Sequence, residues 1–324
     1  MNTKEEFEKL FNNELSEETA RAFLMELYTQ GESYEDIAIA AKVMREHSIK
    51  LPIPERLQNQ AIDVVGTGGD KSGSFNISTT VSLLLASLGS VVAKHGNRSI
   101  TSNSGSADAL ESLGINLNLS PEQQVKMLEE TGFCFIFAMN HHPAMKHIMP
   151  IRKSIDHRTI FNILGPLTNP AGAKRYLLGV FAPEYIERMA KALVELDASR
   201  AFVVSSDDGM DEISLATTTQ FAYVEGGIVS HGVIDPEAFG FKKAPKEAIL
   251  GGTATQNAQI TRDIFEGNAT DAQRDIVLLN AGFALFADGK ARDIQEAFEM
   301  AREGLASGKA KAHLAKIATV SNQL

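Results

Sequence analysis

The chain has 324 residues, 44% of them hydrophobic, and a formal net charge of −10 from 31 basic and 41 acidic side chains. This length and composition allow a large buried core in one or two domains and argue against disorder. The acidic balance argues against a general binder of nucleic acid or of membrane surfaces, although a local cluster of donors can still hold an anion.

The first 60 residues are predicted to be all helical. Ser16 can cap a helix that ends at Gly31, and Ser33 with Asp36 resembles the capping box of a second helix. The sequence Leu-Pro-Ile-Pro at 51–54 then stops helix propagation. We therefore expect a small helical domain over 1–60, with which a helical segment around 145–175 can pack.

The rest of the chain alternates between strand and helix patterns and is predicted to form one larger α/β domain over 61–324. The expected strands are 61–65, 91–93, 133–138, 176–181 and 201–205, with helices at 77–88, 107–113, from Ser120 onward, and at 183–196. A hairpin is expected over 221–233, followed by helices at 272–286, 294–305 and 310–317. This alternation predicts an α/β fold with a mostly parallel central sheet flanked by helices.

The single cysteine, Cys134, lies in an apolar run and is predicted to be a small core residue. One cysteine cannot form an internal disulfide, which fits a reducing cytosol. No uncharged apolar stretch reaches the length that crosses a bilayer.

A glycine-rich stretch, Gly-Thr-Gly-Gly-Asp at 66–70, follows the first expected strand. Glycines allow backbone amides to approach a ligand closely, and successive N–H groups form an anion-binding concavity. The stretch indicates a site for phosphate or pyrophosphate; a plain tight turn is the alternative. Asn76, Ser78 and Thr79 open the next helix and face the same pocket on this interpretation, or else serve only as caps.

A second polar cluster, Lys-His-Gly-Asn-Arg at 94–98, follows the short strand at 91–93, with Ser102 and Ser106 after it. Groups past the carboxyl end of a strand lie where open α/β sheets bind ligands, and Lys94 suits a phosphate as a point charge. The alternatives are a polar loop and, for Arg98, a structural ion pair.

Four carboxylates occur in the sequence Asp-Asp-Gly-Met-Asp-Glu at 207–212, directly after an expected strand. Such groups are hard ligands suited to Mg²⁺, while a solvated acidic loop is the alternative. Arg152 offers a planar fork that matches a carboxylate, unless it is only a surface charge.

The ordered motifs together resemble the anthranilate phosphoribosyltransferase family over nearly the whole chain. They are the stretches at 66–70 and 94–98, Asn-Ile-Ser-Thr at 76–79, Ser-Gly-Ser-Ala-Asp at 104–108, and Phe-Asn-Ile-Leu-Gly-Pro-Leu-Thr-Asn-Pro at 161–170. The resemblance implies transfer of the phosphoribosyl group of phosphoribosyl pyrophosphate (PRPP) to the amino group of anthranilate, a step of tryptophan biosynthesis. It also implies Mg²⁺ as cofactor and a cytoplasmic homodimer formed through the N-terminal helices.

The same resemblance assigns site residues. Those expected to bind PRPP are Gly66, Gly69, Asp70, Ser74, Asn76, Ile77, Ser78, Thr79, Lys94, Ser102 and Ser106. Gly66, Asn97 and Arg152 are expected to bind anthranilate, with His95 and His142 as walls of its pocket. Ser78, Asp211 and Glu212 are expected to hold the metal. No general base is assigned, because an aryl amine is largely unprotonated at neutral pH.

Three other functions stay open at this point. A pyrimidine nucleoside phosphorylase of the same fold would use inorganic phosphate, and the intact motifs at 94–98 and 211–212 argue against it. A non-catalytic, nucleic-acid-binding relative would need a basic groove, against the net charge of −10. A metabolite-binding module would bind PRPP without turnover.

Overall fold

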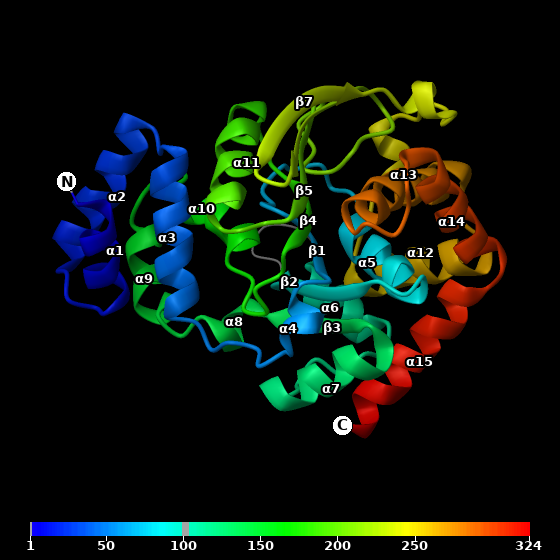
Figure 1. Cartoon of the computed structure of the whole chain (residues 1–324), viewed down its shortest axis with the longest axis horizontal. Coiled ribbons are helices and arrows are strands. Elements are labelled where there is room, and N and C mark those ends of the chain that lie inside the picture. Colours follow the sequence, from blue (N-terminus) through cyan, green and yellow to red (C-terminus); the bar gives the residue numbers. More distant parts are fainter. Residues whose placement is uncertain (1, 99–103) are drawn as a thin grey trace.

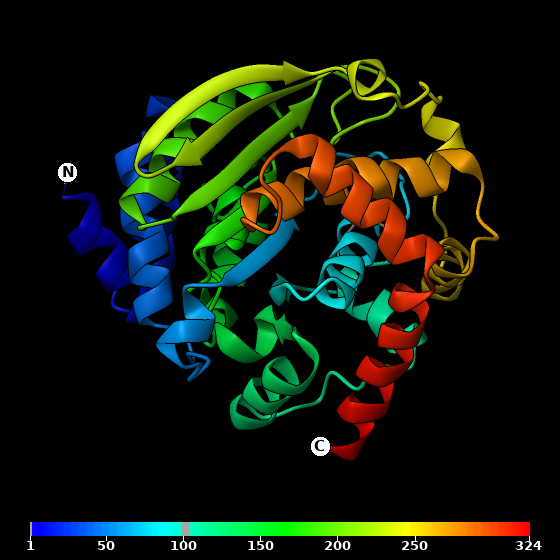
Figure 2. The ribbon, with the colours of Figure 1, turned by 45° about the vertical axis from the view of Figure 1, so that its right-hand side comes forward.

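The computed structural model describes residues 2–98 and 104–324, and a seven-stranded sheet forms its central layer. The strand order is β3-β2-β1-β4-β5-β6-β7, with β1 to β5 parallel and β6 and β7 antiparallel. The strands are β1 (Ala61–Gly66), β2 (Val91–Gly96), β3 (Phe133–Phe137), β4 (Arg175–Gly179), β5 (Arg200–Ser206), β6 (Thr219–Glu225) and β7 (Ile228–Ile234). The last two extend the sheet as a long, curved hairpin (Figure 2).

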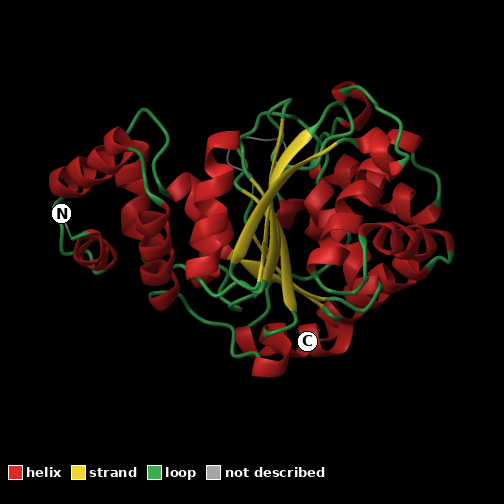
Figure 3. Ribbon diagram, turned by 45° about the horizontal axis from the view of Figure 1, so that its top comes forward, coloured by secondary structure: helices red, strands yellow, loops and turns green. Residues whose placement is uncertain are grey.

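Helices cover both faces of this sheet (Figure 3). On one face α5 (Ile77–Ser87) and α13 (Asp271–Ala287) pack together and against β1, β4 and β5. Behind them lie α12 (Ala254–Glu266), α14 (Ile294–Ala306) and α15 (Lys309–Gln323). On the other face α11 (Ile186–Glu195) packs on β5 and β6. Near the β3 edge of the sheet, α6 (Ser106–Ser112) packs against α12 and α7 (Pro121–Thr131) packs against α15 and on β3 itself.

The N-terminal helices form a separate group beside α11 (Figure 1). They are α1 (Thr3–Phe11), α2 (Glu17–Gln30) and α3 (Tyr34–Glu46), and α3 packs against α11. Two later helices join them: α9 (Met145–Lys153) contacts α1 and α2, and α10 (Phe161–Leu164) contacts α3. The arrangement confirms the predicted fold class, a small helical domain plus a larger α/β domain, while the boundary near residue 60 stays a prediction.

The remaining elements are short. They are α4 (Glu55–Gln58), α8 (Ala138–His141), and the 3-10 turns η1 (Gly165–Leu167), η2 (Pro183–Tyr185), η3 (Pro236–Phe239) and η4 (Lys246–Ile249). Within the part of the chain that the structure describes, no helix is both long and apolar enough to cross a membrane.

Local signals in the sequence fix several element ends as expected. Ser16 accepts a hydrogen bond from the backbone of Thr19, Gly31 ends the same helix, and the capping box of Ser33 is present. Cys134 is buried in β3. The sequence pattern did not reveal α1 or α12, and it ended β2 too early, since that strand continues through Gly96.

The strand order creates a switch point between β1 and β4. The chain proceeds from β1 to β2 and β3 on one side, then crosses to β4 and β5 on the other. Ligands of open α/β sheets bind at the carboxyl ends of strands at such a point. The final residues of the two strands, Gly66 and Gly179, are direct partners across the ladder.

The packing of α13 on α14 yields a stability prediction. A methyl group at Gly282 would overlap the fully buried ring of Phe298, so Gly282→Ala should destabilise the fold by about 1–3 kcal/mol. An alanine in an unconstrained helix interior would instead stabilise it by about 1 kcal/mol. The control is Gly304→Ala, whose methyl group would meet flexible aliphatic side chains instead of a ring, Leu88 Cδ2 at 2.8 Å and Leu84 Cδ1 at 3.3 Å. Urea unfolding should show the larger loss for Gly282→Ala, and a gain there would contradict the packing described.

Candidate active site at the carboxyl ends of β1 and β4

The carboxylate of Asp211 lies directly over the switch point. Its Oδ2 accepts a 2.7 Å hydrogen bond from the backbone N–H of Gly68, in the glycine loop that follows β1. A side chain at either Gly66 or Gly179 would overlap Asp211. Glycine at both strand ends therefore lets the acidic loop after β5 reach the glycine loop, which brings together two motifs far apart in the sequence.

Glu212 adjoins the first turn of α5 and the ammonium group of Lys94. The backbone N–H of Ser78 donates to the Glu212 carboxylate, and Lys94 Nζ donates to Ser78 Oγ at 3.2 Å. Loss of hydration raises the pKa of Glu212 well above its usual value, and the neighbouring Asp211 raises it further. Burial likewise raises the pKa of Asp211, with a contribution from Asp70. The structure thus brings the three predicted metal ligands, Ser78, Asp211 and Glu212, together. Lys94 lies beside the two carboxyl groups, and their pKa values are nevertheless raised.

Lys94 is not in a loop past β2, as the sequence suggested, but inside that strand. Its side chain is 2% exposed and its Nζ donates to the carbonyl of Val64 at 2.6 Å. Burial lowers the pKa of Lys94, while Asp63 and Glu212 oppose that shift. Lys94 is therefore a buried residue that donates hydrogen bonds to Val64 of β1 and Ser78 of α5. Its role toward a phosphate stays a prediction.

The start of α5 places the Asn-Ile-Ser-Thr motif beside the glycine loop. Asn76 Oδ1 accepts a hydrogen bond from Asn257 Nδ2 of α12 at 2.9 Å, which fixes the side chain at the helix entrance. Thr79 Oγ1 is buried and has no hydrogen-bond partner among the described residues. Ile77 is 1% exposed, so only its backbone can contact a ligand. Ser74 pairs with Leu250 in an isolated bridge at the far end of the loop.

The Asn-Arg end of the second cluster borders α6. Ser106 Oγ donates to the carbonyl of Asn97 at 3.2 Å, so these two predicted residues lie together. Arg98 forms ion pairs with Asp108 and Glu111, which is the structural role left open for it. Ser102 lies outside the described residues.

Arg152, His95 and His142, which the sequence analysis assigned to the anthranilate pocket, contact the segment around α10 or one another. The Arg152 guanidinium lies 5.3 Å from the centroid of the Phe161 ring, and no carboxylate of the described residues pairs with it. His95 Nδ1 contacts the Gly165 carbonyl at 3.1 Å, and His142 Nε2 lies 3.3 Å from His95 Nε2. Burial lowers the pKa of both histidines, so both rings are neutral at pH 7.

Several supporting residues escaped the sequence analysis. Asn280, fully buried in α13, holds the backbone of Ile213 with two hydrogen bonds, at 3.0 and 2.9 Å. Asp208, in the acidic stretch at 207–212, accepts hydrogen bonds from Ser206 Oγ and Ser214 Oγ at 2.6 and 2.8 Å. These contacts shape the turn that carries Asp211. A lone asparagine in the apolar stretch of α13 was the signal available in the sequence.

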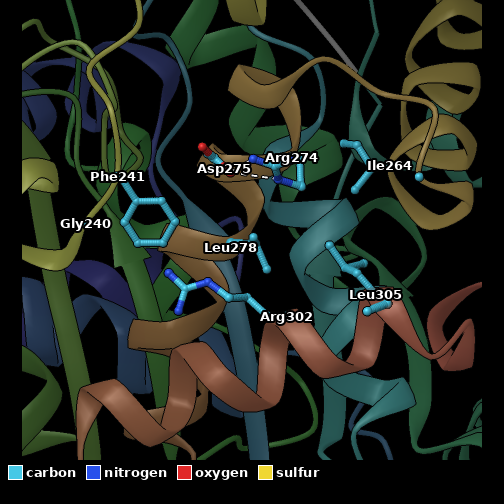
Figure 4. Close-up of a pocket in the computed structure, with 10 residues that line it drawn as sticks. Gly240, Phe241, Ile264, Arg274, Asp275, Leu278, Arg302 and Leu305 are labelled. Atoms are coloured by element: carbon cyan, nitrogen blue, oxygen red, sulfur yellow. Dashed lines mark hydrogen bonds and ion pairs between the residues drawn. The ribbon is translucent and has the colours of Figure 1, made fainter.

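A pocket of about 420 Å³ lies elsewhere, between α12, α13 and α14 (Figure 4). It is lined by Phe241, Ile264, Leu278 and Leu305, with Arg302 beside them. None of the predicted site residues lines it. The convergence of motifs at the switch point, rather than cavity size, identifies the candidate site.

Comparisons with known proteins give a consistent result. Two family models match: the glycosyl transferase family helical bundle domain over residues 3–48 and its a/b domain over residues 58–311. An anthranilate phosphoribosyltransferase of Rubrobacter xylanophilus is 45% identical over 98% of this chain and 92% of its own. The crystal structure of that enzyme from Thermus thermophilus aligns with a TM-score of 0.92 at 42% identity, covering 99% of this chain and 94% of that one. The Saccharomyces cerevisiae enzyme in complex with PRPP and Mg aligns with a TM-score of 0.85 at 27% identity, covering 95% of this chain and 86% of that one.

The buried histidine pair makes stability depend on pH. Burial lowers the pKa of His142 from 6.5 to about 4, so below pH 6.5 the unfolded chain binds more protons than the folded chain. Between pH 7 and 4.5 this should remove about 2–3 kcal/mol of unfolding free energy. His142→Gln should lose less stability over the same range in urea titrations. Equal pH dependence of the two proteins would contradict the neutral buried state.

Proposed function

The chain belongs to the anthranilate phosphoribosyltransferases of the glycosyl transferase family, and we propose that the site at β1 and β4 performs their reaction. The enzyme transfers the phosphoribosyl group of PRPP to the amino group of anthranilate in tryptophan biosynthesis. The products are N-(5-phosphoribosyl)anthranilate and pyrophosphate. The observation that supports this location best is the meeting of the glycine loop, the start of α5 and the acidic pair at one switch point.

We assign the PRPP site to the glycine loop and the first turn of α5. Gly68 and Gly69 have φ angles of +68° and +73°, conformations that glycine adopts without strain. The backbone N–H groups of such a loop, with the positive end of the following helix, suit a pyrophosphate. The buried hydroxyl of Thr79, which has no hydrogen-bond partner within residues 2–98 and 104–324, supports a polar ligand beside this turn.

We propose that Asp211, Glu212 and Ser78 hold Mg²⁺ together with oxygens of PRPP. The donor set fits: hard oxygen atoms from two carboxylates and a hydroxyl leave positions for phosphate and water, as Mg²⁺ prefers. The raised pKa of both carboxyl groups supports this proposal, because a bound cation would favour their charged forms. Bound Mg²⁺ would neutralise charge on the departing pyrophosphate.

We propose that Arg152 binds the carboxylate of anthranilate. Its guanidinium is fixed against the Phe161 ring and carries no carboxylate partner among the described residues. His95 and His142, expected as walls of the same pocket, are buried and neutral, so they add no second cation there.

In the proposed reaction the amine nitrogen forms a bond to the anomeric carbon of the ribose as the bond from that carbon to pyrophosphate breaks. The nitrogen then gives up one proton. The amine is uncharged at neutral pH, so we assign no side chain as a general base. The backbone donors of the glycine loop stabilise charge as it accumulates on the leaving group, and substrate alignment lowers the barrier further.

We further propose a cytoplasmic homodimer formed through the N-terminal helices. The apolar side chains of Met25 on α2 and Ile49 after α3 are 40% and 47% exposed on this part of the molecule. Such surface is available for contact with a second copy of the chain.

Activity should require all three components of the reaction. We expect loss of anthranilate fluorescence only with PRPP and Mg²⁺ present, and none with excess EDTA. Replacing both metal ligands, Asp211→Asn with Glu212→Gln, should lower kcat/KM by at least about 100-fold. The matched control Asp207→Asn, in the same acidic loop, should stay within about twofold of the unchanged protein. Full activity of the double variant would refute the metal assignment.

The anthranilate assignment has its own test. Loss of a charged, two-pronged hydrogen bond in Arg152→Ala should raise the KM for anthranilate by about 10- to 100-fold and leave the KM for PRPP near its original value. Arg152→Lys keeps the charge but not the planar fork, so its KM should be intermediate. Steady-state fluorescence kinetics measure both constants. An unchanged KM for anthranilate in Arg152→Ala would remove Arg152 from the pocket.

A further inference from the structure

Arg158 contacts the glycine loop from outside the motifs described so far. It lies in the segment 154–160, between α9 and α10, and its side chain is exposed. Its Nη2 donates a 2.8 Å hydrogen bond to the carbonyl of Gly69, and no carboxylate of the described residues pairs with it. This exposed arginine therefore bonds a backbone carbonyl of the glycine loop rather than an acidic side chain.

The guanidinium group of Arg158 is fixed by an aromatic platform. Its carbon Cζ lies 3.5 Å from the centroid of the Phe181 ring, just past the end of β4. The backbone N–H of Phe181 donates to Thr67 Oγ1 at 3.1 Å, and Tyr185 packs edge-on against the ring with centroids 5.1 Å apart. A planar guanidinium on an aromatic face keeps its N–H groups in a defined plane. The platform is therefore tied to the same loop that Arg158 contacts.

The contact sets the direction of one peptide group in the loop. Gly68 and Gly69 lack side chains that would restrict the rotation of their peptides. In a trans peptide the C=O and N–H groups point in opposite directions, so binding the Gly69 carbonyl turns the N–H of Asp70 away from Arg158. On the preceding residue, Asp211 binds the Gly68 N–H at 2.7 Å. Two side chains from outside the loop thus orient two of its peptides, the one between residues 67 and 68 and the one between residues 69 and 70.

We propose that Arg158 is a positioning residue, which holds the peptide of Gly69 and Asp70 so that the Asp70 N–H faces the phosphate groups of PRPP. This inference rests on the proposed function of the glycine loop as the PRPP site. Arg158 acts through the backbone of the loop and touches no reacting atom. The same segment stacks His157 on Tyr28 of α2, with ring centroids 3.8 Å apart, so the helical domain supports the position of Arg158.

The test compares Arg158→Ala and Arg158→Lys with Lys153→Ala. Lys153 is an exposed cation at the end of α9, so its removal changes net charge equally without touching the loop. Calorimetry measures the Kd of PRPP without anthranilate, and steady-state kinetics give both KM values and kcat. We expect Arg158→Ala to raise the Kd and KM of PRPP by about 5- to 10-fold, with the KM for anthranilate, kcat and Tm nearly unchanged. Arg158→Lys, which keeps a donor without the flat stack, should be intermediate, and Lys153→Ala should match the unchanged protein.

Limited trypsin digestion gives a second readout that does not depend on turnover. Lys71, directly after the glycine loop, is an exposed cleavage site at a φ of +57°. Cleavage after Lys71 should be faster in Arg158→Ala than in Lys153→Ala, since the loop loses its anchor. Equal PRPP affinity in Arg158→Ala and the unchanged protein would overturn the proposal, as would an equal loss in Lys153→Ala. An unchanged protein that binds PRPP without turnover would overturn the proposed function instead, and a weaker Kd in Arg158→Ala would still support the positioning role.

Discussion

Close approach of Asp211 to the ends of β1 and β4 is the constraint on which the site depends. Asp211 can lie there because Gly66 and Gly179 have no side chains: one at Gly66 would overlap its carboxylate, and one at Gly179 its backbone. In return, Asp211 binds the backbone of Gly68 and so holds the glycine loop over the switch point. The ends of β1 and β4, the glycine loop and the acidic loop therefore meet at this one residue.

Electrostatics gives this arrangement its chemical character. Lys94 is buried near Asp63 and Glu212. Burial lowers the pKa of Lys94, and the two carboxyl groups oppose that shift. Burial raises the pKa of Asp63 to about 7, although Asn169 Nδ2 donates to it at 2.8 Å. One ammonium group does not balance this many carboxyl groups, so the pKa of both Asp211 and Glu212 is raised and the pair favours protonation when no further cation is bound. A binding site for a divalent cation with phosphates resolves that imbalance, which is why the proposed substrates suit this position.

The helical domain contributes to the candidate site through the short segment that carries Arg152 and Arg158. Arg152, near the end of α9, and Arg158, in the following segment, belong to a region that packs on α1, α2 and α3 rather than on the sheet. Arg152 lies against Phe161, whereas Arg158 reaches the glycine loop. If both substrate sites are as proposed, a segment supported by the helices contacts each of them, and we expect the small domain to help align the two substrates.

The sequence by itself determined whatever depends on neighbours along the chain. Helix caps such as Ser16 and Ser33, the alternation of strands and helices, and the glycine loop are local patterns, and they sufficed for the fold class and most of the motifs. The tertiary structure decided the partners: Arg158 and Gly69 are 89 residues apart, and Asn280 and Ile213 are 67 apart. Lys94 shows the reason most clearly. A lysine after three apolar residues resembles the start of a loop, and it can remain in the strand only because a distant carbonyl and carboxylates compensate its burial.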